Sequence, residues 1–374
     1  MVHEVSNSTF NIQHSTFNIM IDAYRFFRFS AFGATAVLPL LGAGSVRPRL
    51  GLRPALGLLG VAAAFHAFAY VHNDVCDLEL DRSQPLRAEY PLVRGDVSPR
   101  AALAVALGCV PLAFVIDAWL LGDERRATNG QQPISHPPSS FILHPSSLLA
   151  SAFALMAAYN RWGKACPFPP ATDLLQGAGW TLLIAYGAAA VGRPAGRLTG
   201  ALMAYELLLI LMVNGVHGAL RDIGNDRGRG AYTTAIMLGA AETPDGLRVP
   251  AGLLAYALAL QAGLLALPLW AATENLGSYR ASHGTVVAFG VSGTVGLTVA
   301  LLAEAARGGA RPADVGMLHL ILLLSAPVAL VAPGLGPPLR AVTLLAHTLP
   351  LLANGMTYDA LRWICGSGIP SSLS

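Results

Sequence analysis

The residues best suited to chemistry lie in one short stretch, residues 72–81, with the sequence HNDVCDLELD. In a helix, Asn73, Asp77 and Asp81 would recur at every fourth position, and Asp74 would lie on the same broad face. Carboxylates gathered on one face repel each other unless a cation lies among them. Oxygen ligands without cysteine or histidine favour Mg²⁺ or Ca²⁺ over zinc. The stretch therefore predicts a metal site whose ligands are these four side chains.

This acidic stretch follows a long apolar segment, residues 55–70, and leads into a basic loop. In a soluble protein, a solvated acidic helix end would be an equally good interpretation. At the end of a membrane helix, ionisable groups are functional by default. The position of the stretch therefore favours a functional site.

The composition indicates an integral membrane protein. Of the 374 residues, 54% are hydrophobic and only 12% are charged, whereas soluble domains carry about 25% charged residues. The net charge of +3 is too small to indicate nucleic-acid binding. The four cysteines are widely spaced, and they predict neither a disulfide framework nor a zinc site.

A second acidic cluster lies in residues 214–234, where Asp222 and Asp226 are four positions apart at the end of another apolar segment. Two carboxylate clusters at equivalent ends of membrane helices predict a shared polyanion held through metal ions. The four helices expected between them also hint at a weak internal duplication. His217 and Asn214 lie just before this cluster, and a hydrogen-bonded packing role is the simpler interpretation for both.

A bound diphosphate needs positive donors as well as metal. Arginine forks match phosphate oxygens in pairs, and lysine acts as a point charge. The predicted diphosphate-binding residues are Arg87, Arg94, Lys164 and Arg221. For each of them, the excess of positive charge on cytoplasmic loops is the competing explanation.

Ten apolar segments, at roughly 28–46, 55–80, 99–122, 147–160, 171–192, 199–221, 250–271, 284–305, 313–333 and 338–357, predict nine or ten membrane helices. Their many glycines and alanines favour close helix packing in lipid. We expect one membrane domain at 20–365, a non-native or disordered extension at 1–19, and a flexible loop insertion at 123–147, which is rich in proline and serine.

The distribution of lysine and arginine predicts the orientation. With the N-terminus in the cytoplasm, the inner segments hold fourteen of these residues and the outer loops hold eight. Both acidic clusters then face the cytoplasm, and we expect a multi-pass protein of a bacterial-type cytoplasmic membrane.

The two motifs resemble those of the UbiA superfamily of intramembrane prenyltransferases. Residues 73–81 look like its first motif, NDxxDxxxD, and Asp222-x-x-x-Asp226, continuing to Gly230 and Thr233, is similar to its second. Tyr159 and Lys164 also resemble the family's Tyr/Lys helix end. The resemblance covers about residues 25–335. In place of the family's usual Arg-Pro-Leu, this sequence has Tyr90 before Pro91, and a third aspartate of some members is replaced here by Gly230.

The resemblance implies an all-α membrane protein, with about nine transmembrane helices around a central cavity that opens on the cytoplasmic side. It also implies two Mg²⁺ ions that bridge the aspartates to an isoprenyl diphosphate. The expected catalytic residues are Asp74, Asp77, Asp81, Asp222 and Asp226, and the expected metal ligands are these five with Asn73. The expected partners are an isoprenyl diphosphate, a lipophilic or aromatic acceptor and membrane lipid, with no nucleic acid and no obligate protein partner.

Two alternatives stay open. Within the family, the prenyl group could go to a sugar-phosphate or glycerol-phosphate acceptor. In another class, a cation transporter could use the aspartate clusters. Transporter sites tend to lie near the bilayer midplane on broken helices, whereas these clusters occupy helix ends beside basic loops.

Overall fold

The computed structural model describes residues 19–84, 87–122, 144–244, 246–276, 298, 300, 302–303 and 311–354. Within these ranges the chain is helical apart from its connections and one short hairpin. The predicted extension at 1–19 lies outside them except for Ile19, and so does the predicted loop insertion as far as residue 143. Helix α8 begins at Pro145, two residues before the predicted end of that insertion.

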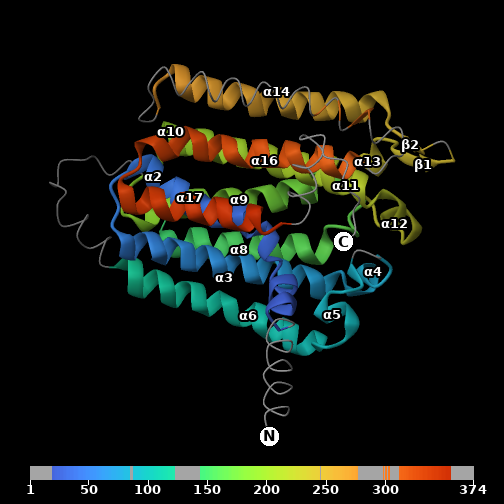
Figure 1. Ribbon diagram of the computed structural model, residues 1–374, viewed down its shortest axis with the longest axis horizontal. Coiled ribbons are helices and arrows are strands. Elements are labelled where there is room, and N and C mark those ends of the chain that lie inside the picture. Colours follow the sequence, from blue (N-terminus) through green and yellow to red (C-terminus); the bar gives the residue numbers. More distant parts are fainter. Residues whose placement is uncertain are drawn as a thin grey trace, which may run out of the picture.

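Nine helices of fifteen or more residues form the bundle within the described ranges. They are α2 (Phe32–Val46), α3 (Leu52–Cys76), α6 (Pro99–Ile116), α8 (Pro145–Trp162), α9 (Pro169–Ala190), α10 (Arg197–Met212), α14 (Ala251–Thr273), α16 (Arg311–Val331) and α17 (Pro337–Leu352). Figure 1 shows them lying side by side along one axis, with α6 and α14 on opposite sides of the bundle.

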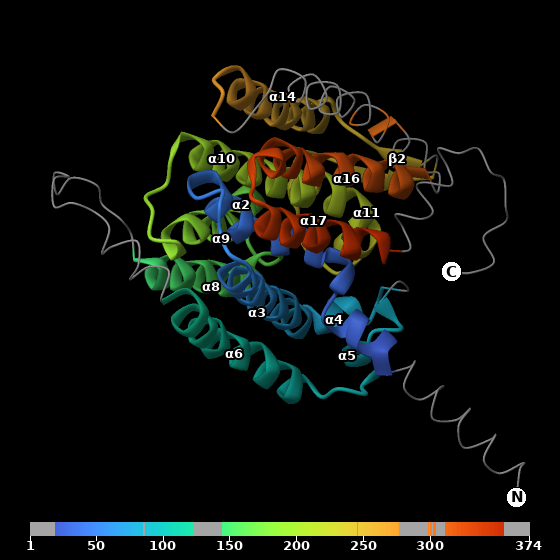
Figure 2. The same ribbon diagram turned by 60° about the vertical axis from the view of Figure 1, so that its left-hand side comes forward.

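Short elements connect the long helices. They are η1 (Phe29–Ala31), α4 (Leu78–Asp81), α5 (Pro91–Arg94), η3 (Asp117–Leu121), η4 (Val213–Gly218), α11 (Ala219–Arg221), α12 (Ile223–Gly228), α13 (Thr234–Met237) and η5 (Ala332–Gly334). An antiparallel hairpin of β1 (Ala241–Thr243) and β2 (Gly246–Arg248) is an addition to the expected all-α fold. In Figures 1 and 2, α4, α5, α11 and the hairpin gather at the same end of the bundle.

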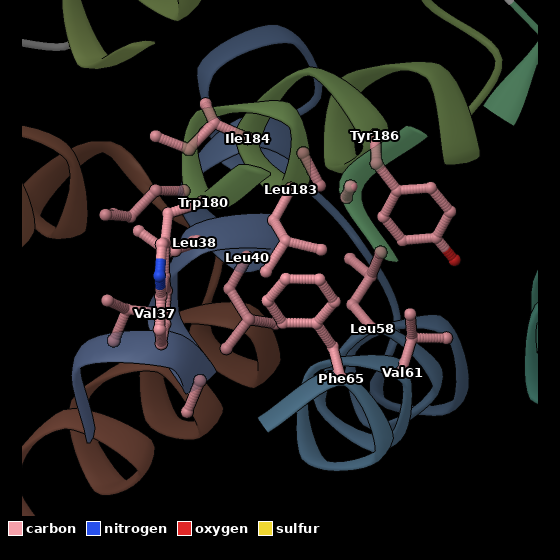
Figure 3. Close-up of a cluster of buried hydrophobic side chains, with 14 of the residues drawn as sticks. Val37, Leu38, Leu40, Leu58, Val61, Phe65, Trp180, Leu183, Ile184 and Tyr186 are labelled. Atoms are coloured by element: carbon pink, nitrogen blue, oxygen red, sulfur yellow. The ribbon is translucent and has the colours of Figure 1, made fainter. Parts of the chain in front are cut away.

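The centre of the bundle is packed by apolar side chains from α2, α3 and α9, including Phe65, Leu183 and Ile184 (Figure 3). Two glycines bring α2 and α9 into backbone contact. A Cβ atom on Gly42 would lie 1.9 Å from the Ile184 carbonyl oxygen, and one on Gly187 would lie 2.0 Å from the Pro39 carbonyl oxygen. Small residues permit this approach, as they do in membrane helix pairs generally.

Six helical stretches of the described chain are long and apolar enough to cross a membrane. They are Phe29–Val46, Leu52–Cys76, Pro99–Leu121, Arg197–Arg221, Ala251–Thr273 and Gly316–Gly334. Their length and composition agree with the expected integral membrane protein. The predicted number of nine spans stays a prediction, because one predicted segment, 284–305, lies mostly outside the described residues.

Candidate active site

The first acidic motif lies at the C-terminal end of α3. The prediction of one continuous helix through the motif is wrong at one residue. Helix α3 ends at Cys76 and α4 starts at Leu78, and Asp77 between them has φ −95° and ψ 6°. The backbone N–H of Asp77 still donates to the Asn73 carbonyl oxygen, and that of Asp81 donates to the Asp77 carbonyl oxygen, each at 2.8 Å. The helical hydrogen bonds therefore carry the motif through the break.

The second motif has the same local structure. Helix α11 ends at Arg221 and α12 starts at Ile223, and Asp222 between them has φ −101° and ψ 6°. The N–H of Asp226 donates to the Asp222 carbonyl oxygen at 2.9 Å. Each motif thus interrupts its helix at an aspartate, and a second aspartate follows four residues later.

The two motifs also correspond residue by residue. Five identical pairs are separated by the same 145 positions (222 minus 77): Val71 and Val216, His72 and His217, Asp77 and Asp222, Asp81 and Asp226, and Arg82 and Arg227. The register is a property of the sequence itself, although the spacing of the aspartates alone does not reveal it. The shared backbone geometry supports the internal duplication suggested above.

Lys164 joins the two motifs. It follows α8, and its Nζ lies 3.7 Å from Asp77 Oδ2 and 3.5 Å from Asp226 Oδ1. The Ser83 hydroxyl, just after the first motif, donates to Asn225 Oδ1 in the second at 2.8 Å. Asp77 and Asp226 therefore lie on one shared site, although 149 positions separate them (226 minus 77).

Arg28 is a site residue that the sequence analysis missed. Its guanidinium forms two hydrogen bonds with the Asp74 carboxylate, and its Nη2 lies 3.7 Å from Asp81 Oδ2. It also lies over the rings of Tyr70 and Tyr90, at 5.5 Å and 5.9 Å from their centroids. In the sequence, Arg28 lies three positions after Arg25 at the start of an apolar segment, and no motif distinguishes it from the other basic residues.

Arg28 has a left-handed backbone, with φ 46° and ψ 47°, which is uncommon for a residue with a side chain. His66 of α3 holds the chain there, with its Nε2 2.9 Å from the Phe27 carbonyl oxygen and 3.3 Å from that of Arg28. Because carbonyl oxygens only accept hydrogen bonds, Nε2 carries the proton. Nδ1 then accepts from the Thr35 hydroxyl at 2.8 Å. His66, 3% exposed, thereby positions Arg28.

The other predicted basic residues divide into two groups. Arg221 forms a two-pronged hydrogen bond with Asp222, at 2.9 Å and 2.7 Å. Arg87 packs over the Tyr90 ring and interacts electrostatically with both Asp74 and Asp222. Arg94, in contrast, pairs with acids outside both motifs, namely Asp22, Glu89 and Asp96.

His217 and Asn214 lie deeper in the bundle than the aspartates. His217 Nε2 is 3.0 Å from His319 Nδ1 on α16, and His319 is in turn hydrogen-bonded to Gln261. Asn214 donates to Gln176 of α9. Both side chains are hydrogen-bonded packing residues, as expected.

Burial and nearby positive charges shift the pKa values of the aspartates in opposite directions. Burial raises the pKa of Asp77 and of Asp226, and the charge of Lys164 offsets part of that rise. Burial would also raise the pKa of Asp222, but the hydrogen bonds from Arg221 and the nearby positive charges lower it. A cation close to Asp77 and Asp226 would favour their charged forms.

The donor set fits a hard divalent cation that shares its coordination with a ligand. Within the described ranges, no three His, Cys, Asp or Glu side chains converge closely enough to enclose a metal by themselves. Mg²⁺ usually takes only one or two carboxylates and completes its shell with water and phosphate oxygens. Asp77 and Asp226, which converge on one ammonium group, offer that kind of incomplete oxygen site.

The model of the UbiA prenyltransferase family matches residues 31–124. Among solved structures, the apo form of a UbiA homologue from Aeropyrum pernix K1 is 21% identical, with a TM-score of 0.55 over 83% of this chain and 96% of that one. A UbiA homologue from Archaeoglobus fulgidus bound to GPP and Mg²⁺ is 17% identical, with a TM-score of 0.56 over 83% and 99%.

A structure of digeranylgeranylglyceryl phosphate synthase is 15% identical, with a TM-score of 0.57 over 84% of this chain and 98% of that one. No curated protein matches the chain significantly. At these identities the solved structures establish a shared fold, which covers more than four fifths of the chain.

Proposed function

We propose that this chain is a member of the UbiA superfamily, on the strength of the family model and the shared fold. We further propose that it transfers a prenyl group from an isoprenyl diphosphate to a lipophilic or aromatic acceptor within the membrane and releases diphosphate. The observation that carries the proposal is the convergence of Asp77 and Asp226 on Lys164. The structural neighbours that are bound to GPP or DMAPP with Mg²⁺ give further support.

Mg²⁺ is the proposed cofactor. The residues that would hold it are those of the two motifs: Asn73, Asp74, Asp77, Asp81, Asp222 and Asp226. When bound, Mg²⁺ neutralises the charge that develops on the departing diphosphate. The like-charged carboxylates are already held close together by Lys164 and Arg28, so binding requires little rearrangement of the backbone.

The basic residues bind and orient the diphosphate. Lys164, Arg28 and Arg221 each pair with an aspartate of a motif, and each has further N–H donors that a diphosphate bound beside the aspartates could use. Arg87 interacts with aspartates of both motifs. Charged donors fixed in advance stabilise the leaving group as the C–O bond breaks. The apolar bundle shields the allylic cation from water until the acceptor reacts with it.

The distribution of basic residues supports a site that faces the cytoplasm, with both motifs at one end of the bundle (Figure 1). The acceptor is a separate question. The glycerol-phosphate alternative has one supporting observation, the shared fold with digeranylgeranylglyceryl phosphate synthase, and the assay below distinguishes it from an aromatic acceptor.

The proposed activity is tested by incubating membranes that contain the chain with labelled prenyl diphosphates and extracted lipids. We expect a prenylated lipid product, lost on chelation of Mg²⁺ and restored when Mg²⁺ is added. Mass spectrometry of the product identifies the acceptor. Cation flux in proteoliposomes without any Mg²⁺-dependent binding of prenyl diphosphate would contradict the proposal and favour the transporter.

Replacing His66 by alanine tests how Arg28 is positioned. The substitution removes the donor to the Phe27 and Arg28 carbonyl oxygens, so Arg28 is no longer held toward Asp74. We expect KM for the prenyl diphosphate to rise about tenfold, as for one lost hydrogen bond, with a smaller change in kcat. His66→Gln, which keeps a donor, should restore part of the loss. Equal losses in both variants, or a change in kcat alone, would argue against this role.

A further inference from the structure

The N-terminal part of α9 lies between the segments that carry Lys164 and Asp226. Helix α9 begins at Pro169, shortly after Lys164. Asp173 on this helix is 7% exposed, and its Oδ2 accepts a hydrogen bond from the Thr234 hydroxyl at 2.6 Å. Thr234 is 2% exposed and begins α13, the helix that follows the second motif. A buried carboxyl group therefore fixes α13 to α9.

The segment between the second motif and α13 completes the connection to Lys164. The Ala231 N–H donates to the Asp226 carbonyl oxygen at 2.8 Å, and the Tyr232 N–H donates to the Lys164 carbonyl oxygen at 3.3 Å. The next bond along the chain is the one to Asp173. Three successive hydrogen bonds thus tie this short segment to the motif, to the end of α8 and to α9.

Helix α9 also holds the segment before the second motif. Gln176, on the next turn, accepts a hydrogen bond from Asn214 of η4. The Thr172 hydroxyl donates to the carbonyl oxygen of Gly163, the residue before Lys164, at 3.3 Å. The first turns of α9 therefore contact both sides of the second motif and the end of α8. The position of Lys164 relative to the aspartates depends on these contacts.

We propose that Asp173 is a positioning residue for the transfer reaction, which holds the Lys164 ammonium group between Asp77 and Asp226. This proposal rests on the proposed prenyl transfer. A lysine side chain is a flexible four-carbon stem, yet this one places a single charge within 3.7 Å of a carboxylate in each motif. Fixing its backbone reduces the conformational freedom that the charged group would otherwise lose in the reacting complex.

The proposed role uses the acceptor oxygen of Asp173 and does not require its charge. Asparagine keeps an acceptor oxygen at nearly the same volume, whereas leucine has a similar size and no acceptor. Leucine would leave the buried Thr234 hydroxyl without its partner, which favours movement of the segment away from α9. Thr234→Val removes the same hydrogen bond from the other side and keeps the carboxyl group.

The test measures metal binding, so that it does not depend on turnover. The full-length protein in lipid nanodiscs is titrated with Mn²⁺ at a saturating concentration of geranyl thiolodiphosphate, and electron paramagnetic resonance measures the bound ion. Lys164→Met should bind Mn²⁺ about tenfold more tightly than wild type, because the ammonium group no longer competes for the carboxylates. Asp173→Leu should shift the affinity in the same direction by about threefold, since the ammonium group is displaced but still present. Asp173→Asn should bind Mn²⁺ as wild type does.

A double-mutant cycle identifies the residue through which Asp173 acts. In the Lys164→Met background, Asp173→Leu should change neither the Mn²⁺ affinity nor the turnover further, because the group that it positions is gone. Thr234→Val should reproduce the effect of Asp173→Leu, and the two changes together should do no more than either alone. Thr234→Val also tests the same contact if Asp173→Leu does not fold.

Asp117→Leu is the matched control. Asp117 is 3% exposed and accepts a hydrogen bond from the Tyr186 hydroxyl at 2.8 Å, so it forms the same kind of buried pair. It lies on η3, where Leu121 packs against Gly57 near the start of α3, at the opposite end of that helix from the first motif. This variant should lower thermal stability and leave the Mn²⁺ affinity unchanged, with or without Lys164→Met.

Three results would overturn the positioning role. They are weaker binding of Mn²⁺ by Asp173→Leu, an undiminished effect of Asp173→Leu in the Lys164→Met background, and equal shifts in Asp173→Asn and Asp173→Leu. Failure of wild type to bind Mn²⁺ together with the thiolodiphosphate would instead contradict the proposed function.

Discussion

Asp226→Asn is expected to reduce prenyl transfer at least about a hundredfold, because it removes one buried charge from the proposed metal site without changing the side-chain volume. Asp226 is 2% exposed, and its Oδ1 lies 3.5 Å from Lys164 Nζ. An amide at this position is a weaker ligand for Mg²⁺ than a carboxylate. The measurement is the turnover of a labelled prenyl diphosphate at equal amounts of inserted protein.

Asp77→Asn extends this test, since Asp77 contacts the same ammonium group from the other motif. If the two carboxylates act together, the double variant should be little slower than either single variant, as for catalytic residues that work as a unit. Asp96→Asn is the control, because Asp96 is an exposed acid paired with Arg94 outside both motifs. Activity close to wild type in Asp226→Asn, or multiplied losses in the double variant, would contradict a shared site.

Lys164→Met is expected to slow prenyl transfer and, at the same time, to strengthen the binding of Mg²⁺. Turnover should fall about a hundredfold, because the proposed site loses a positive charge that would stabilise the departing diphosphate. The Mg²⁺ concentration needed for half-maximal activity should fall as well, because the ammonium group no longer competes for Asp77 and Asp226. A magnesium titration of the turnover rate measures both effects.

The controls for this second experiment separate charge from position. Lys164→Arg keeps the charge and should recover part of the turnover, although its fork binds the carboxylates differently. Arg161→Gln removes a positive charge from an exposed side chain at the same end of α8 and should have little effect. A higher magnesium requirement in Lys164→Met would show that the lysine supports metal binding, contrary to the expectation.

The local features of the site follow from the sequence. The spacing of Asp77 and Asp81, and of Asp222 and Asp226, predicts pairs of carboxylates one helical turn apart, because the period of a helix is set by the backbone. The chemistry of the donors predicts a hard cation whatever the fold. The apolar segments predict membrane helices, because their length and composition must match the lipid interior.

Some boundaries of the predicted elements, and one short hairpin, were wrong or missing in the prediction from the sequence. The helix break at Asp77 and the start of α8 at Pro145 are differences of one or two residues, and short turns at helix ends depend on packing as much as on the residues themselves. The β1–β2 hairpin was not expected, because its strands are only three residues long.

The tertiary structure alone decided which positive side chain faces which aspartate. Arg28 lies 46 positions from Asp74, Lys164 lies 62 positions from Asp226, and no periodicity connects residues on different helices. Arg87 and Arg94 both lie in the basic loop after the first motif, so the sequence does not distinguish them. In the fold, however, Arg87 interacts with Asp74, whereas Arg94 pairs with Asp22. The sequence by itself determined the kind of site, because ligand chemistry and helical spacing are local. Helix packing determined its members, because partners across a bundle are set by how the helices dock.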